Sequence, residues 1–137
     1  MTPVRAAFDA AAGHPRTVLI LSPTCPVCTG VVDALQHQLE THPEADVRVV
    51  VVYSRFLRWD RLGLRAATRA RLHDSRVTLQ VWDPDGVVAA SLCAATPSSM
   101  CITSPRLFGW VGWWPAGAPW GWPTWTAWDA LPALANE

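Results

Sequence analysis

Two cysteines, three positions apart, are the side chains of this sequence best suited to chemistry. Cys25 and Cys28 stand in the string Ser-Pro-Thr-Cys-Pro-Val-Cys at residues 22–28. Two thiols at this spacing can exchange electrons with a disulfide or bind a soft metal ion, and both reactions need a thiolate. The elements on either side of the pair therefore determine which thiol can react.

The cysteines lie between a predicted strand and a predicted helix. Residues 17–21 form a continuous apolar run, which is typical of a strand buried on both faces. From Pro26 to Thr41 the apolar residues, Cys28 among them, follow a helical stripe. The unpaired N–H groups and the positive dipole end of a helix N-terminus stabilise a thiolate. Cys25 is therefore the expected nucleophile, Pro26 suits the first helical position, and Cys28 can attack a mixed disulfide formed on Cys25.

Up to residue 92, the chain alternates between predicted helices and strands. Two parallel strands joined by a helix form a right-handed unit in nearly all proteins, and a short turn such as Asp-Pro-Asp-Gly makes the strands on either side antiparallel. The predicted elements are a helix at 3–12, the strand at 17–21, a helix at 26–41, a strand at 47–53, a helix at 56–72, a strand at 77–82, a turn at 83–86 and a strand at 87–92.

The composition changes near residue 92, and the chain becomes rich in Trp, Pro and Gly. Seven of the nine Trp residues lie between Trp110 and Trp128, in a pattern that is typical of neither helix nor strand. We therefore divide the chain into a core at 1–92 and an extension at 93–137, with a weak helix candidate at 129–136. Three interpretations of the extension stay open: it wraps the sheet, it binds a partner, or it results from a frame shift in a GC-rich sequence.

The string at residues 22–28 resembles the active-site string of the thioredoxin-like superfamily. It is most similar to the thioredoxin-like proteins that assist methylamine dehydrogenase maturation, and residues 82–88 look like the strand-turn-strand of the redoxin group. The resemblance covers about residues 15–92. It implies an α/β fold with a four-stranded mixed central sheet and flanking helices, followed here by the irregular Trp-rich extension.

The resemblance also implies a function and a site. The function is thiol–disulfide oxidoreductase activity without a cofactor, with a disulfide-containing protein or a small thiol as partner. Cys25 and Cys28 are then the catalytic residues, with Thr24, Pro26 and Val27 beside them.

Two positions depart from the pattern of that superfamily. Many thioredoxins keep a buried acid six residues before the first cysteine, and Leu19 occupies this position. Most members also place a cis-proline at the start of the third strand, beside the cysteine pair. Arg76-Val77-Thr78 takes that place here, which makes Val77 a predicted neighbour of the site.

Charge and hydropathy exclude some other classes of function. Eleven basic and eleven acidic residues give a formal net charge of zero, which argues against nucleic acid as a partner. No apolar run approaches the roughly 20 residues that cross a bilayer, and charged residues interrupt the region where a signal-peptide core would lie. We therefore predict a cytoplasmic protein.

Other reactive side chains have weaker patterns. Cys93 and Cys101, with seven residues between them, can complete a four-thiolate zinc site, form a second disulfide or a thiol relay, or be incidental; the pair lacks the usual short ligand spacing, and the last interpretation is favoured. Among the four His residues, His14 alone lies in a loop predicted to approach the site, and none is predicted to be catalytic. An Arg stripe on the helix at 56–72 is typical of a solvated face rather than a binding patch. Its members are Arg58, Arg61, Arg65 and Arg69.

Two rival functions use the same residues differently. The first is a non-catalytic protein that binds or delivers a soft metal through the thiolates of Cys25 and Cys28. The second is an interaction module, in which the Trp-rich extension contacts a partner.

Overall fold

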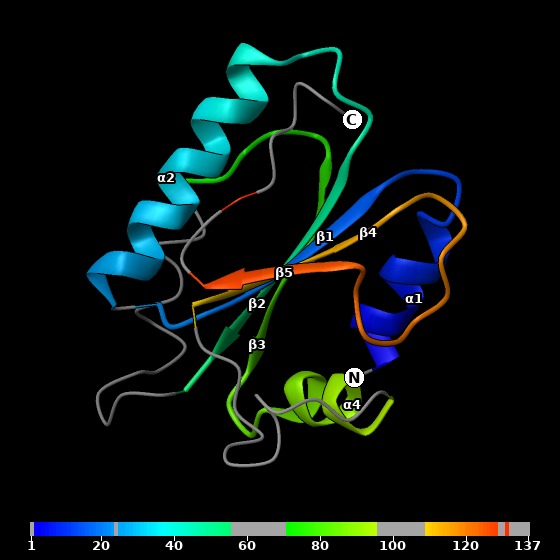
Figure 1. Cartoon of the computed structure of the whole chain (residues 1–137). Helices are drawn as coiled ribbons and strands as arrows, with labels where there is room; N and C mark the ends of the chain where they lie inside the picture. Colours follow the sequence, from blue (N-terminus) through cyan, green and yellow to red (C-terminus); the bar gives the residue numbers. More distant parts are fainter. Residues whose placement is uncertain (1, 24, 56–70, 96–108, 129–130, 132–137) are drawn as a thin grey trace.

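The computed structural model describes residues 2–23, 25–55, 71–95, 109–128 and 131. In this part of the chain, three helices pack against one five-stranded sheet (Figure 1). Helix α2 covers one face, and helices α1 and α4 cover the other. The elements are α1 (Thr2–Ala10), β1 (Arg16–Leu21), α2 (Pro26–Thr41), β2 (Arg48–Ser54), β3 (Val77–Asp83), α4 (Val87–Ala95), β4 (Trp110–Trp114) and β5 (Trp125–Trp128).

Strand β1 occupies the centre of the sheet, whose strand order is β3-β2-β1-β4-β5. It pairs in parallel with β2 and antiparallel with β4, and β2 pairs in parallel with β3. All six residues of β1 are buried. The sequence prediction of a strand buried on both faces is confirmed, and so is the mixed α/β sheet with flanking helices.

The side chains of β1 alternate between two apolar clusters. Leu19 and Leu21 pack on the α2 face, while Val18 and Ile20 pack on the face covered by α1 and α4. Full burial of such a side chain contributes about 1.5–3 kcal/mol. The direction of β1, and the place where it ends, are therefore held from both faces.

The segment after the turn at 83–86 is a helix, so the prediction of a strand at 87–92 is wrong. The carboxylate of Asp83 accepts hydrogen bonds from the N–H groups of Val87 (3.1 Å) and Val88 (3.0 Å), which caps the start of α4. Gly86 takes a left-handed conformation (φ 68°) that redirects the chain into this helix. Among the described strands, β3 therefore lies at the edge of the sheet, next to β2.

The Trp-rich segment completes the sheet, which corrects the predictions of four strands and of an irregular extension. Residues 110–114 and 125–128 form β4 and β5, so the sheet crosses the change in composition near residue 92. The division into domains stays a prediction. The rings of Trp110 and Trp114 are buried and lie edge-on to one another, with centroids 6.3 Å apart. The side chains of β4 alternate between the two faces of the sheet with the two-residue period of a strand. The sequence conceals this period, because aromatic residues lie on both faces.

The buried guanidinium of Arg16 fastens the loop between β4 and β5 to the rest of the molecule. It donates to the carbonyl oxygens of Phe8 (3.2 Å), Pro115 (3.2 Å) and Ala118 (2.5 Å), and it lies 4.0 Å from the centre of the Phe8 ring. Desolvation lowers the pKa of Arg16 from its ordinary value, and the charge of Asp9 opposes this shift. One side chain thus joins α1, β1 and the Trp-rich segment.

The Trp-rich segment yields a prediction at Gly112. A Cβ atom on this residue would lie 2.3 Å from Cη2 of Trp110, in a fully buried ring. We expect Gly112→Ala to lower the free energy of unfolding by about 1–3 kcal/mol, the usual cost of overpacking. Urea unfolding followed by circular dichroism measures this.

The matched control is Gly30→Ala on the exposed face of α2. A Cβ atom there meets nothing within 4 Å, so the variant should gain up to about 1 kcal/mol from higher helix propensity. A Gly112→Ala protein as stable as the wild type would contradict the tight packing of Trp110 on β4.

Candidate functional site

Cys25 lies where strand β1 gives way to helix α2. Strand β1 ends at Leu21 and helix α2 begins at Pro26, which makes Cys25 the N-cap residue, with extended backbone angles (φ −71°, ψ 124°). Its carbonyl oxygen accepts the N–H of Thr29 at 3.0 Å, the first hydrogen bond of the helix. The sequence predicted this junction, and the structure places Cys25 at the helix N-terminus, where its side chain makes no capping hydrogen bond.

Cys28 lies one turn further along α2, inside the core. It is 1% exposed and belongs to the apolar cluster between α2 and the sheet, against which the half-buried Cys25 also packs. The Sγ atom of Cys28 accepts the backbone N–H of Ser22 at 3.4 Å. Neither cysteine is disulfide-bonded. The two thiols therefore share one site, with Cys25 reachable from solvent and Cys28 beneath it.

The other predicted neighbours of the pair differ in their outcome. Thr24 lies outside the described residues, and so do the side chains of Pro26 and Val27, although Pro26 opens α2 as predicted. Val77 does not lie beside the cysteines. It pairs with Val49, which pairs with Thr17 near the amino end of β1, whereas the cysteines follow its carboxyl end.

The segment beside the carboxyl end of β1 is the start of β4, which sequence reasoning missed. Trp110 pairs with Ile20, and the residue before it, Gly109, is buried and left-handed (φ 62°). None of the peptide bonds in the described residues is cis. The place that the superfamily resemblance assigned to Val77 therefore belongs to Gly109 and Trp110. A signal was present in the alternation of Trp110, Gly112 and Trp114 with Val111 and Trp113.

The position at which many thioredoxins hold an acid is apolar here, as the sequence indicated. Leu19 is fully buried in the same cluster as Cys28. A carboxylate therefore does not reach Cys28 from this position, whereas the backbone N–H of Ser22 contacts its sulfur.

Cys93 on α4 is disulfide-bonded, so the interpretation of this residue as incidental is wrong. Its partner lies outside the described residues, and so does Cys101. A disulfide-bonded Cys93 offers no thiolate to a metal, which removes it from the four-thiolate site considered above.

The remaining predicted candidates lie away from the pair or outside the described residues. His14 lies just before β1, at the end opposite the cysteines, and its Nδ1 is 2.8 Å from the carboxylate of Asp46. The hydrogen bond with His14 is the main cause that lowers the pKa of Asp46. The Arg stripe at 58–69 lies outside the described residues. Among the helices that the structure describes, none is both long and apolar enough to traverse a bilayer.

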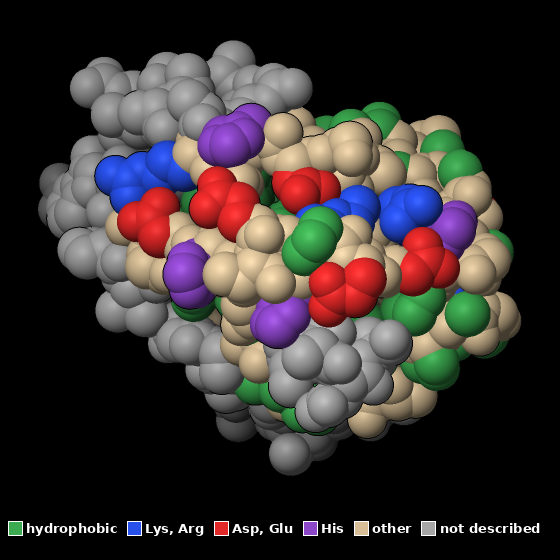
Figure 2. All heavy atoms as spheres, turned by 90° about the horizontal axis from the view of Figure 1, so that it is seen from above, with side chains coloured by type: hydrophobic (Ala, Val, Ile, Leu, Met, Phe, Trp, Pro, Cys, Tyr) green, Lys and Arg blue, Asp and Glu red, His purple; other side chains and the backbone are tan. Residues whose placement is uncertain are grey.

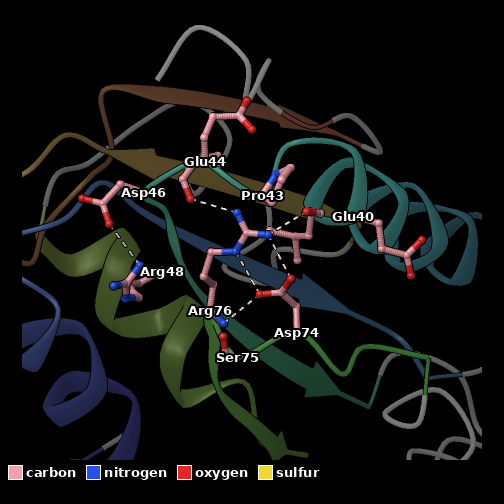
Figure 3. A pocket seen from close by; sticks show the side chains of 10 residues that line it. Glu40, Pro43, Glu44, Asp46, Arg48, Asp74, Ser75 and Arg76 are labelled. Carbon is pink, nitrogen blue, oxygen red and sulfur yellow. Dashed lines mark hydrogen bonds and ion pairs between the residues drawn. The ribbon is translucent and has the colours of Figure 1, made fainter.

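A hollow of about 520 Å³ lies at the end of the sheet opposite the cysteines, where acidic, Arg and His side chains alternate over the surface (Figure 2). Arg76 occupies its floor (Figure 3). Its guanidinium donates to the carboxylate of Asp74 twice (2.9 Å each) and to the carbonyl oxygens of Leu39 (2.6 Å), His42 (2.8 Å) and Ala45 (2.8 Å). Since these bonds use all five N–H donors of Arg76, the residue ties the end of α2 to the start of β3 and offers none to a ligand.

Comparison with solved structures identifies the fold. A secreted Mycobacterium tuberculosis disulfide oxidoreductase homologous to E. coli DsbE superposes with a TM-score of 0.57 at 15% identity, over 91% of this chain and 75% of that one. MTB DsbF superposes with a TM-score of 0.52 at 19% identity, over 80% of this chain and 69% of that one. A Neisseria meningitidis protein assigned as a thioredoxin gives 0.59 at 13% identity, over 93% and 73%.

The chain therefore has a thioredoxin-like fold, as the sequence predicted. Its identity to these structures is too low for them to show more than the fold. No protein-family model matches the sequence, and no curated protein matches it.

The different burial of the two cysteines predicts their order of reaction. With the protein reduced at the Cys25–Cys28 pair, we expect iodoacetamide to alkylate Cys25 first. Cys28 should react only as the protein opens locally, because its side chain is 1% exposed. Peptide mass mapping along a time course measures both rates, and equal rates would contradict the placement of Cys28 in the core.

The Asp74–Arg76 pair predicts how stability depends on pH. The hydrogen bond from Arg76 is the main cause that lowers the pKa of Asp74, and the same bond raises the pKa of Arg76. A carboxyl group whose pKa is lower in the folded than in the unfolded state stabilises the fold above its unfolded pKa of about 4, and this contribution is lost as the pH falls. We expect Asp74→Asn to lower the free energy of unfolding by about 1.5–3 kcal/mol at pH 7, and by less below pH 4.

Urea unfolding at several pH values measures this difference. Asp33→Asn is the matched control, since the Asp33–Arg71 ion pair is exposed (2.8 Å) and should contribute at most about 1 kcal/mol. An equal decrease in the free energy of unfolding in the two variants would show that the Asp74–Arg76 pair does not hold the end of α2.

Proposed function

We propose that this protein is a thiol–disulfide oxidoreductase that acts through Cys25 and Cys28. The observation that carries the proposal is the placement of a half-buried cysteine at the N-cap of α2 with a second, buried cysteine one turn deeper. The thioredoxin-like fold supports it, because one structure with the same fold is a disulfide oxidoreductase and another, MTB DsbF, is described in mixed oxidised and reduced forms.

The proposed reaction consists of two thiol–disulfide exchanges. The Cys25 thiolate attacks one sulfur of a substrate disulfide, a mixed disulfide forms, and the first substrate sulfur leaves as a thiolate. The Cys28 thiolate then attacks the Sγ atom of Cys25, and the second substrate sulfur leaves. Two electrons have passed to the substrate, the protein holds a Cys25–Cys28 disulfide, and a second dithiol must reduce it to close the cycle.

The reverse sequence oxidises a dithiol, and the reduction potential of the pair sets the favoured direction. The chemistry lies in the two sulfur atoms, so the proposed steps need no organic cofactor. The partner is a protein disulfide or a small thiol. The cytoplasmic location stays a prediction, and the disulfide at Cys93 favours an oxidising compartment instead.

Trapping tests the proposal. We expect Cys28→Ser to accumulate a mixed disulfide on Cys25 with a model disulfide such as oxidised glutathione, because the second exchange has lost its nucleophile. Intact mass and peptide mapping detect the adduct. Cys25→Ser is the control, and it should form no adduct at this site and show no insulin-reductase activity with dithiothreitol.

The opposite result would point to the rival function. If neither variant forms an adduct and the wild type reduces no disulfide, the oxidoreductase proposal is wrong. Stoichiometric zinc or Cu(I) in anaerobically purified protein, lost in both variants, would then favour a metal-binding protein.

A further inference from the structure

The buried sulfur of Cys28 has a polar contact from a residue that lies outside the cysteine motif proper. Ser22 follows directly after β1, and its backbone N–H points at the Sγ atom of Cys28 over 3.4 Å. Cys28 is 1% exposed, so bulk water does not solvate an anion at this sulfur. A buried anion is costly unless a hydrogen-bond donor compensates it.

Among the residues that the structure describes, the cluster around Cys28 is mainly aliphatic. Its titratable side chains are Cys25 and Tyr53, and the hydroxyl of Tyr53 already donates to Oε1 of Gln80 at 2.8 Å. Leu19 fills the place from which an acid would act. The backbone N–H of Ser22 is therefore placed to stabilise the thiolate of Cys28 by a hydrogen bond.

We propose that the N–H of Ser22 is a catalytic group for the second exchange, an inference that rests on the proposed function. When the Cys28 thiolate attacks Cys25 in the mixed disulfide, the new bond joins the two cysteine sulfurs and the bond to the substrate sulfur breaks. The proton that Cys28 gives up ends on the departing substrate thiolate. The N–H of Ser22 stabilises the attacking anion and aligns its sulfur below Cys25.

The two cysteines lie in different backbone settings. Cys25 is the N-cap residue of α2 and its side chain makes no capping hydrogen bond, whereas the sulfur of Cys28 contacts the N–H of the first residue after β1. Strand β1 pairs with β2 up to Leu21 and with β4 up to Ile20, so the sheet fixes the chain directly before the Ser22 N–H. The sheet therefore holds the donor still while the sulfurs exchange partners.

Replacing this one N–H by an ester oxygen tests the inference in the full chain. Cys25 permits ligation of a synthetic 1–24 peptide to residues 25–137, and lactic acid in place of residue 22 removes the N–H. Ser22→Ala, ligated in the same way, is the matched control with the amide retained. A second control carries lactic acid in place of Ala12, whose N–H bonds to a turn carbonyl at Asp9.

The measured quantity is the rate at which Cys28 releases glutathione from a preformed mixed disulfide on Cys25. We expect the residue-22 ester to lower this rate at pH 7 by about tenfold, the effect of one lost hydrogen bond to a charged group, and to move the rise of the rate to higher pH. The residue-22 ester is compared with Ser22→Ala, which has the same side chain and keeps the amide, and the Ala12 ester should match the wild type. Equal rates with and without the Ser22 N–H would overturn the inference, whereas no release in any all-amide protein would overturn the proposed function instead.

A second measurement does not depend on how well the ester folds. In Cys25→Ser, the Ser22 amide proton should shift as Cys28 ionises, with the same midpoint as the thiolate absorbance at 240 nm. We expect this shift to be the largest among the backbone amides of the chain. A Ser22 amide signal that stays constant through the titration would overturn the inference.

Discussion

The site depends on the central strand β1, which is paired on both edges and buried on both faces. A strand held in this way has one possible end point and one direction at that point. The chain leaves the sheet at Leu21 and enters α2 at Pro26, and the four residues between must turn within that short span. This constraint places Cys25 at the helix N-cap. It also brings the Cys28 sulfur back to the end of β1, within reach of the Ser22 N–H.

The Trp-rich segment matters to the site because it supplies the second neighbour of β1. Strand β4 pairs with β1 along residues 16–20, and its Trp110 and Trp114 side chains pack on the face covered by α1. Arg16 closes this arrangement by binding carbonyl groups of α1 and of the β4–β5 loop. The unusual composition after residue 92 therefore serves the same architecture as the apolar strands before it, and Trp110 and Gly109 stand where the superfamily resemblance predicted a different segment.

Local signals predicted the local structure well and the sheet order less well. The apolar run before Cys25, the helix after it and the burial of Leu19 follow from periodicity and from residue type. The helix at Val87 was missed, because a turn signal such as Asp-Pro-Asp-Gly also caps a helix through the Asp83 carboxylate. The position of Val77 was missed for a related reason: pairing between distant strands depends on topology, and no local pattern distinguishes an edge strand next to β2 from an inner strand next to β1.

Equilibration with glutathione buffers shows whether Cys25 and Cys28 form a reversible disulfide. The protein is incubated at graded ratios of reduced to oxidised glutathione, quenched with acid, alkylated and analysed by mass. We expect two dominant species, the dithiol and the Cys25–Cys28 disulfide, whose ratio follows the square of the reduced glutathione concentration divided by that of the oxidised form. A pair that stays reduced at every ratio, or that carries only glutathione on Cys25, would contradict this expectation.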